Sequence, residues 1–107
     1  MIIYEVNLTV DPEIFSDYYT WLIDHIQKML KFSGFTRAEV ATEKKSVDEA
    51  KHLTVRYFVS SENHLEDYFQ NHANYMRQAT IDRFGDKVSA TRRVFHSHSM
   101  IHEDVSE

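Results

Sequence analysis

Asn7 and the charged residues around it are the side chains of this sequence best placed to do chemistry. Residues 2–10 alternate so that Tyr4 and Val6 share one face of a predicted strand, while Glu5 and Asn7 share the other. The second face is too polar for a dry core, and asparagine is depleted inside strands. We therefore take Asn7 as a candidate ligand-binding and catalytic residue.

A second group of candidates is aromatic or basic. A strand predicted over residues 53–59 carries Arg56 and Phe58 on the face away from its apolar residues. Trp21 and His72 fall on predicted helices beside other aromatic residues, where most such side chains belong to the core. The candidate ligand-binding residues are Asn7, Arg56, Phe58, Trp21 and His72. The candidate catalytic residues are Asn7 and His72.

The seven histidines raise the question of a metal site. His96 and His98 lie on one face of a predicted strand and His102 follows, but no acid stands among them before Glu103. The absence of cysteine excludes disulfides and thiolate chemistry, and the two glycines are isolated, so no phosphate loop is present. We expect no metal and no cofactor-binding residues.

Composition narrows the class of protein. The 107 residues suffice for one domain, and 42% apolar with 27% charged residues is ordinary globular composition. Twelve Lys and Arg against seventeen Asp and Glu give a net charge of -5, which disfavours nucleic acid as a partner. No apolar run approaches the ~20 residues that span a bilayer. We expect a cytoplasmic protein without nucleic-acid or membrane partners.

Periodicity and the positions of Pro and Gly predict the elements. Asp11 and Pro12 begin a helix, and Gly34 and Gly85 each follow one. The pattern predicts strands over 2–10, 35–43, 53–59 and 88–96, helices over 12–32 and 62–84, and a charged hairpin loop over 44–51. We expect residues 1–97 to form the domain and residues 98–107 a polar, disordered tail.

The order β-α-β-β-α-β predicts an α+β fold. Right-handed crossovers place the first and third strands side by side, which gives a ferredoxin-like, four-stranded antiparallel sheet with two helices on one face. Its expected core comprises Tyr4, Val6, Leu8, Leu22, Ile26, Val55, Tyr57, Phe69 and Met76. On the opposite face, we expect Glu5 and Arg56 each to find an opposite charge across or along the sheet.

Seven short segments resemble a family of bacterial proteins known as domain of unknown function 4286. They are M-I-I-Y-E-V-N-L at 1–8, W-L-x-x-H-I at 21–26, G-F at 34–35, L-T-V-x-Y at 53–57, H-A-x-x-M-R at 72–77, R-F-G at 83–85 and A-x-R-R at 90–93. The family resembles the dimeric α/β-barrel superfamily, which includes antibiotic-biosynthesis monooxygenases. The resemblance therefore implies a homodimer in which two ferredoxin-like sheets face each other.

Haem-degrading enzymes of that superfamily use an asparagine on strand one, a tryptophan near strand three and a histidine on helix two. Asn7 matches the first, and His72 could stand near the third. Tyr57 and Phe58 occupy the region of the missing tryptophan. The resemblance thus implies haem as an alternative cofactor.

Three functions follow from these observations. The leading hypothesis is a homodimer that binds a small, partly apolar molecule between sheet and helices. The enzyme alternative is a cofactor-free or haem-linked monooxygenase, and the third is a structural or regulatory dimer without a ligand. The identity of the ligand and whether the protein is an enzyme do not follow from the sequence.

Overall fold

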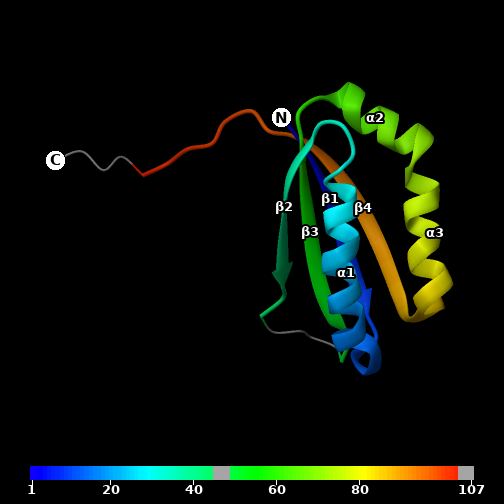
Figure 1. Ribbon diagram of the computed structural model, residues 1–107. Coiled ribbons are helices and arrows are strands. Elements are labelled where there is room, and N and C mark those ends of the chain that lie inside the picture. The colour runs from blue at the N-terminus through cyan, green and yellow to red at the C-terminus, as the bar shows by residue number, and fades with distance from the viewer. Residues whose placement is uncertain (45–48, 104–107) are drawn as a thin grey trace.

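The computed structural model describes residues 1–44 and 49–103, which form one four-stranded antiparallel sheet and its helices (Figure 1). The elements are β1 (Ile2–Val10), the 3-10 turn η1 (Pro12–Ile14), α1 (Phe15–Met29), β2 (Phe35–Thr42), β3 (Lys51–Val59), α2 (Glu62–Asn71), α3 (Ala73–Phe84), the 3-10 turn η2 (Gly85–Lys87) and β4 (Val88–His96). The strand order is β2-β3-β1-β4, so β1 and β3 are central. The predicted ferredoxin-like α+β fold is confirmed.

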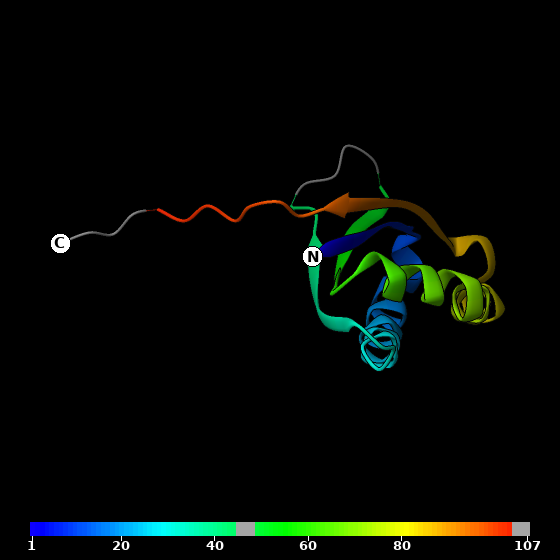
Figure 2. The ribbon, with the colours of Figure 1, turned by 90° about the horizontal axis from the view of Figure 1, so that it is seen from above.

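All helices cover one face of the sheet, and the core lies between them and that face (Figure 2). Alternation along β1 buries Ile2, Tyr4, Leu8 and Val10 on the helix side. The nine predicted core residues all belong to this core or pack against it, with Val6 and Phe69 half-buried. No helix in the described part of the chain is long and apolar enough to cross a membrane.

The prediction of a single helix over residues 62–84 is wrong, because the structure has two helices there, α2 and α3, which meet at His72. The backbone leaves helical geometry there, at φ -132° and ψ -26°, although the His72 amide still donates to the Tyr68 carbonyl at 2.9 Å. The imidazole stacks on Phe32 with ring centroids 4.5 Å apart. No proline or glycine marks this break in the sequence, so the apolar periodicity predicted one continuous helix.

The remaining predicted bounds need smaller corrections. The first helix begins with the separate turn η1, capped by Asp11, and α1 ends at Met29 rather than at residue 32. β2 ends at Thr42, and β3 begins at Lys51, two residues before the predicted start. Within the predicted hairpin 44–51, residues 45–48 lie outside the described residues. Of the predicted tail, residues 98–103 carry no helix or strand, and 104–107 lie outside the described residues.

Gly34→Ala is expected to destabilise the fold more than Gly85→Ala. Both glycines have positive φ, +85° and +61°, but a Cβ on Gly34 would come within 3 Å of three His64 side-chain atoms, whereas one on Gly85 meets open space. Ser61 Oγ holds the His64 ring at 2.7 Å, so the ring cannot withdraw without losing that contact. In urea unfolding, we expect the free energy of unfolding to fall by about 2–4 kcal/mol for Gly34→Ala and by about 1 kcal/mol for Gly85→Ala. Equal losses would show that His64 moves away freely.

Candidate functional site

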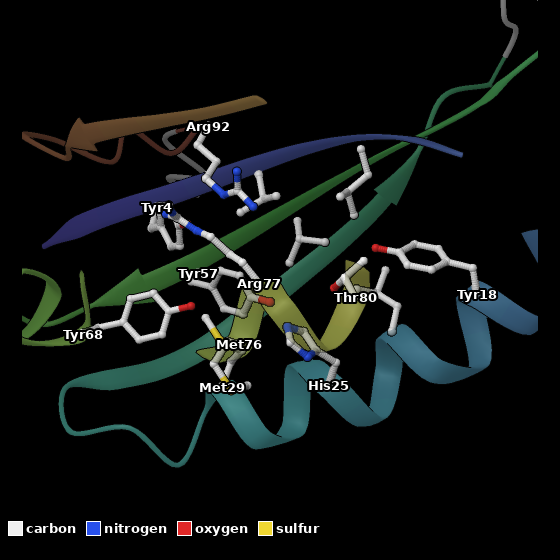
Figure 3. A pocket seen from close by; sticks show the side chains of 14 residues that line it. Tyr4, Tyr18, His25, Met29, Tyr57, Tyr68, Met76, Arg77, Thr80 and Arg92 are labelled. Atoms are coloured by element: carbon white, nitrogen blue, oxygen red, sulfur yellow. The ribbon is translucent and has the colours of Figure 1, made fainter. Parts of the chain in front are cut away.

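A cavity of about 50 Å³ lies between the sheet and the helices (Figure 3). The helix-facing residues of β1, β3 and β4 form one wall, and α1, α2 and α3 contribute the other. Such a space holds a few water molecules or a compact organic group, and it is smaller than a typical drug-sized site. The wall residues that retain solvent exposure are Val6, His25, Arg77, Thr80 and Arg92, which mark its open side.

One part of the cavity is aromatic and rich in sulfur. Tyr4 stacks on Tyr57 at 5.9 Å between ring centroids and lies 6.1 Å from Tyr68. Met29 and Met76 complete this part of the wall with flexible thioethers. Burial raises the pKa of both Tyr57 and Tyr68, so their hydroxyls remain protonated at neutral pH. This region suits an apolar or aromatic ligand group.

A polar part of the cavity centres on His25 of α1. Its imidazole stacks on Trp21 with centroids 4.7 Å apart, and burial, followed by the nearby Lys28 charge, lowers its pKa to about 4. His25 is therefore neutral at pH 7, and one of its ring nitrogens can accept a proton. The Tyr18 hydroxyl also points toward the cavity, and burial raises the pKa of Tyr18. This pair supplies one proton acceptor and one donor.

Acidification is expected to unfold the protein partly through His25. Because the folded-state pKa is about 4 and the ordinary value is 6.5, the unfolded chain binds a proton that the folded chain excludes. The His25 contribution is therefore complete above pH 6.5 and is lost as the pH falls toward 4, by roughly 1–3 kcal/mol. Chemical denaturation across this range should show a shallower pH dependence for His25→Phe. Identical profiles for the variant and the wild type would contradict this assignment.

Two guanidinium groups approach the cavity from opposite elements. Arg77 extends from α3, and its Nη2 donates to the Tyr4 hydroxyl at 3.2 Å. Arg92 extends from β4, where it faces the helices beside Val6 of β1. No Asp or Glu among the described residues lines the cavity. The cavity is therefore positively charged in a chain whose net charge is -5.

None of the five predicted ligand-binding residues lines this cavity. Asn7, Arg56 and Phe58 lie on the opposite face of the sheet, as their alternation with core residues requires. Trp21 stacks on the ring of His25 but does not itself line the cavity, and His72 lies at the break between α2 and α3. The two catalytic candidates, Asn7 and His72, are therefore separated by the sheet. Ligand binding by these five residues stays a prediction.

Sequence reasoning missed the residues that give the cavity its chemistry, namely His25, Arg77 and Arg92. A signal for Arg92 was present, because it alternates with Val88, Ala90 and Val94 on the helix-facing side of β4. An arginine on such a face is unusual unless it has a partner or a ligand. His25 and Arg77 fall beside apolar stripe residues, and only the packed structure shows that they face a cavity.

The opposite face carries a row of alternating charges, Glu39, Arg56, Glu5 and Arg93, one from each strand, which we call the charged row. Arg56 Nε donates to Glu5 Oε2 at 3.0 Å, and Arg56 Nη1 donates to Glu39 Oε1 at 3.1 Å. Arg93 Nη2 donates to Glu5 Oε1 at 2.7 Å. The expected charge partners of Glu5 and Arg56 are thus confirmed, and Arg93 is an additional one.

Glu5 is the centre of the charged row. The Asn7 side-chain amide donates to Glu5 Oε1 at 2.9 Å, and Thr54 Oγ1 donates to Asn7 Oδ1 at 2.8 Å. The Asn7 hydrogen bond, with the Arg93 and Arg56 charges, outweighs burial and holds the pKa of Glu5 below its usual value. Only 2% of the Glu5 side chain is exposed, because these neighbours cover it while Arg93 itself remains 64% exposed. Asn7 therefore links Glu5 to Thr54 within this face of the sheet.

The C-terminal histidines that raised the question of a metal site do not form a metal-binding cluster among the described residues. The His96 and His98 rings stack at 6.3 Å, and His96 Nε2 lies 3.3 Å from a Glu62 carboxylate oxygen. Within residues 1–44 and 49–103, no three His, Asp or Glu side chains come together in a metal-binding arrangement.

Solved structures share this fold at low sequence identity. A protein assigned as an antibiotic biosynthesis monooxygenase from Deinococcus radiodurans aligns over 97% of this chain and 99% of its own, with a TM-score of 0.73 and 11% identity. SnoaB, a cofactor-independent oxygenase from Streptomyces nogalater, aligns over 95% and 98%, with a TM-score of 0.67 and 10% identity. An ethyl tert-butyl ether D family protein from Bacillus halodurans aligns over 92% of this chain and 100% of its own, with a TM-score of 0.67 and 13% identity. These likenesses establish the fold.

Comparison with curated proteins finds no match. The sequence model of one family, the domain of unknown function DUF4286, matches residues 1–98 and thus includes every described helix and strand. The chain belongs to the DUF4286 family.

Proposed function

We propose that the chain forms a homodimer through the sheet face opposite the helices and binds a small, partly apolar molecule in the cavity. The cavity carries the proposal: it joins an aromatic and thioether region to a few convergent polar groups, which is the usual composition of a small-molecule site. The sheet separates it from the proposed dimer face, so both functions fit on one chain.

The dimer part rests on the composition of the opposite face. Beside the charged row lie Ile3, Phe58 and Phe95, and the Arg37 guanidinium covers the Phe58 ring at 4.3 Å. On the other side of that row, Asn7 and Thr54 hydrogen-bond to each other at 2.8 Å. The charges are already paired within one chain, so a second sheet can cover this face without leaving Glu5 unpaired.

Native mass spectrometry of gently purified protein tests the ligand part. We expect a dimer that carries an added small-molecule mass, and we expect Val6→Phe, which fills the cavity, to lower its occupancy at least tenfold. Ile81→Phe introduces the same side chain at an exposed site of α3 and should retain the wild-type mass. Equal added mass on all three proteins would place the molecule elsewhere. No added mass on any of them would favour a structural or regulatory dimer.

A cofactor-free monooxygenase is the second candidate, and the neutral imidazole of His25 inside the cavity favours it. Such chemistry needs a base that removes a proton from an activated C–H or O–H group, so that the resulting anion can reduce oxygen. His25 is placed to accept that proton. Oxygen uptake with an electron-rich phenolic ketone should fall in His25→Ala, and no uptake above buffer by the wild type would exclude this function for that substrate.

The residues do not fit a haem. Asn7 and His72 lie on opposite sides of the sheet, and a haem is several times larger than the 50 Å³ cavity. His72 already stacks on Phe32 at 4.5 Å. The proposed function therefore does not use haem.

A further inference from the structure

Arg77 and Arg92 both line the cavity, and no Asp or Glu of its wall supplies them with a counter-charge. On the opposite face, Arg56 and Arg93 each pair with Glu5 at 3.0 Å or less. For Arg77 and Arg92, no ion pair with a carboxylate occurs within residues 1–44 and 49–103. The chain carries five more acidic than basic residues, so this lack of partners is local rather than a shortage of carboxylates.

Arg77 also has an unfulfilled hydrogen-bonding group. Its Nη2 donates to Tyr4 at 3.2 Å, and its guanidinium lies 5.9 Å from the Phe69 ring centroid. Its Nε is buried without a hydrogen-bond partner among the described residues. A buried, unpaired donor on a charged group is costly, and such groups in a native structure call for an explanation.

The surroundings of the two guanidiniums indicate how an anion would be held. Both line the cavity wall, and Figure 3 shows their side chains extending toward it from α3 and from β4. The positive charge of Arg92 lowers the pKa of Tyr18, Tyr57 and Tyr68, against the larger effect of burial, which raises it. A guanidinium binds a planar carboxylate through two parallel hydrogen bonds, which fix its orientation as well as its position.

We propose that Arg77 and Arg92 form an anion site on the open side of the cavity, and that the ligand is a small carboxylate with a compact apolar body. The carboxylate supplies the counter-charge that the fold lacks. The body lies against Tyr4, Tyr57 and Met76, and the cavity volume takes a few heavy atoms of it, so that a single ring extends to the open side. This inference rests on the proposed function, because it requires the cavity to be a ligand site.

Benzoate, its neutral isostere benzamide and inorganic phosphate are the probes that separate charge from shape. Titration followed by protein NMR gives an affinity and locates each compound. For the wild type, we expect benzoate to shift resonances of cavity residues and to bind at least tenfold more tightly than benzamide, and phosphate to bind more weakly than benzoate.

Three variants complete the experiment. Arg92→Gln alters an exposed side chain and should fold normally, and Arg77→Gln replaces the guanidinium with a neutral amide. Each should lower benzoate affinity at least tenfold and leave benzamide affinity unchanged. Arg83→Gln removes the same charge from an exposed position of α3 outside the cavity wall, and it should bind benzoate as the wild type does.

The outcomes distinguish this inference from the proposed function. Equal binding of benzoate and benzamide in the cavity overturns the anion site but leaves a pocket for apolar molecules. Tighter binding of phosphate than of benzoate overturns the apolar body of the ligand. No shift of cavity resonances by any probe at millimolar concentration overturns both the anion site and the ligand part of the proposed function.

Discussion

Arg56→Glu is expected to dissociate the proposed homodimer. The substitution replaces the alternating charges of Glu39, Arg56 and Glu5 with three adjacent carboxylates at the centre of the sheet face. Covering such a group with a second sheet leaves desolvated like charges without partners, which costs several kcal/mol. We expect the dimer dissociation constant to rise at least 100-fold, which corresponds to about 2.7 kcal/mol. Light scattering at micromolar concentration measures the change.

The control is Lys28→Glu, which makes the same charge change on α1, on the helix side of the sheet. Lys28 is 67% exposed, and its pair with Asp24 is a surface pair worth ~1 kcal/mol or less. Lys28→Glu should therefore leave the dimer intact. A monomeric wild type at micromolar concentration, or an Arg56→Glu variant that stays dimeric, would refute the sheet-to-sheet assembly.

Tyr68→Ala is expected to destabilise the domain by about 3–5 kcal/mol, the range for removal of a buried aromatic side chain. Tyr68 is 3% exposed and links the helices to the sheet through several ring contacts. Its ring centroid lies 6.1 Å from Tyr4, 5.2 Å from Phe32, 5.3 Å from Phe35, 5.9 Å from Phe69 and 6.5 Å from His72. Since domains of this kind have only about 5–15 kcal/mol of stability, much of it would be lost.

Tyr68→Phe separates the ring from its hydroxyl. The hydroxyl points into the cavity and has no hydrogen-bond partner among the described residues. Its loss should therefore change the free energy of unfolding by about 1 kcal/mol or less. Denaturation in urea, with unchanged dependence on denaturant, compares both variants with the wild type. A large loss in Tyr68→Phe would mean that the hydroxyl, rather than the ring, holds this region together.

The fold was largely predictable because its signals are local. Alternation along residues 2–10 and 88–96 set the strand bounds that the structure confirms, and Gly34 and Gly85 marked the turns after helices. The break at His72 was not predictable in this way. The His72 imidazole stacks on Phe32, which is distant in sequence, and a contact of this kind leaves no local signal in the residues around the break.

The candidate site was less predictable because it depends on register and packing. Alternation placed Glu5 and Arg56 on one face, but the pairing of Arg93 with Glu5 follows from the alignment of β1 with β4. The cavity likewise appears only when α1 and α3 meet the sheet, which brings His25 and Arg92 to one space. Unusual residues such as Asn7 drew attention to the face that the structure assigns to internal hydrogen bonds.

The central position of β1 has a consequence for biosynthesis. β1 is the first strand to be translated, yet one of its two partners is β4, the last element of the fold. Until residues 88–96 are made, a nascent chain can pair β1 only with β3, so the other side of β1 is an open strand edge, which is a template for aggregation. Contacts between such distant segments also slow folding. A chain stalled or cleaved before Val88 would therefore be a substrate for chaperones and proteases, even though most of its core residues are present.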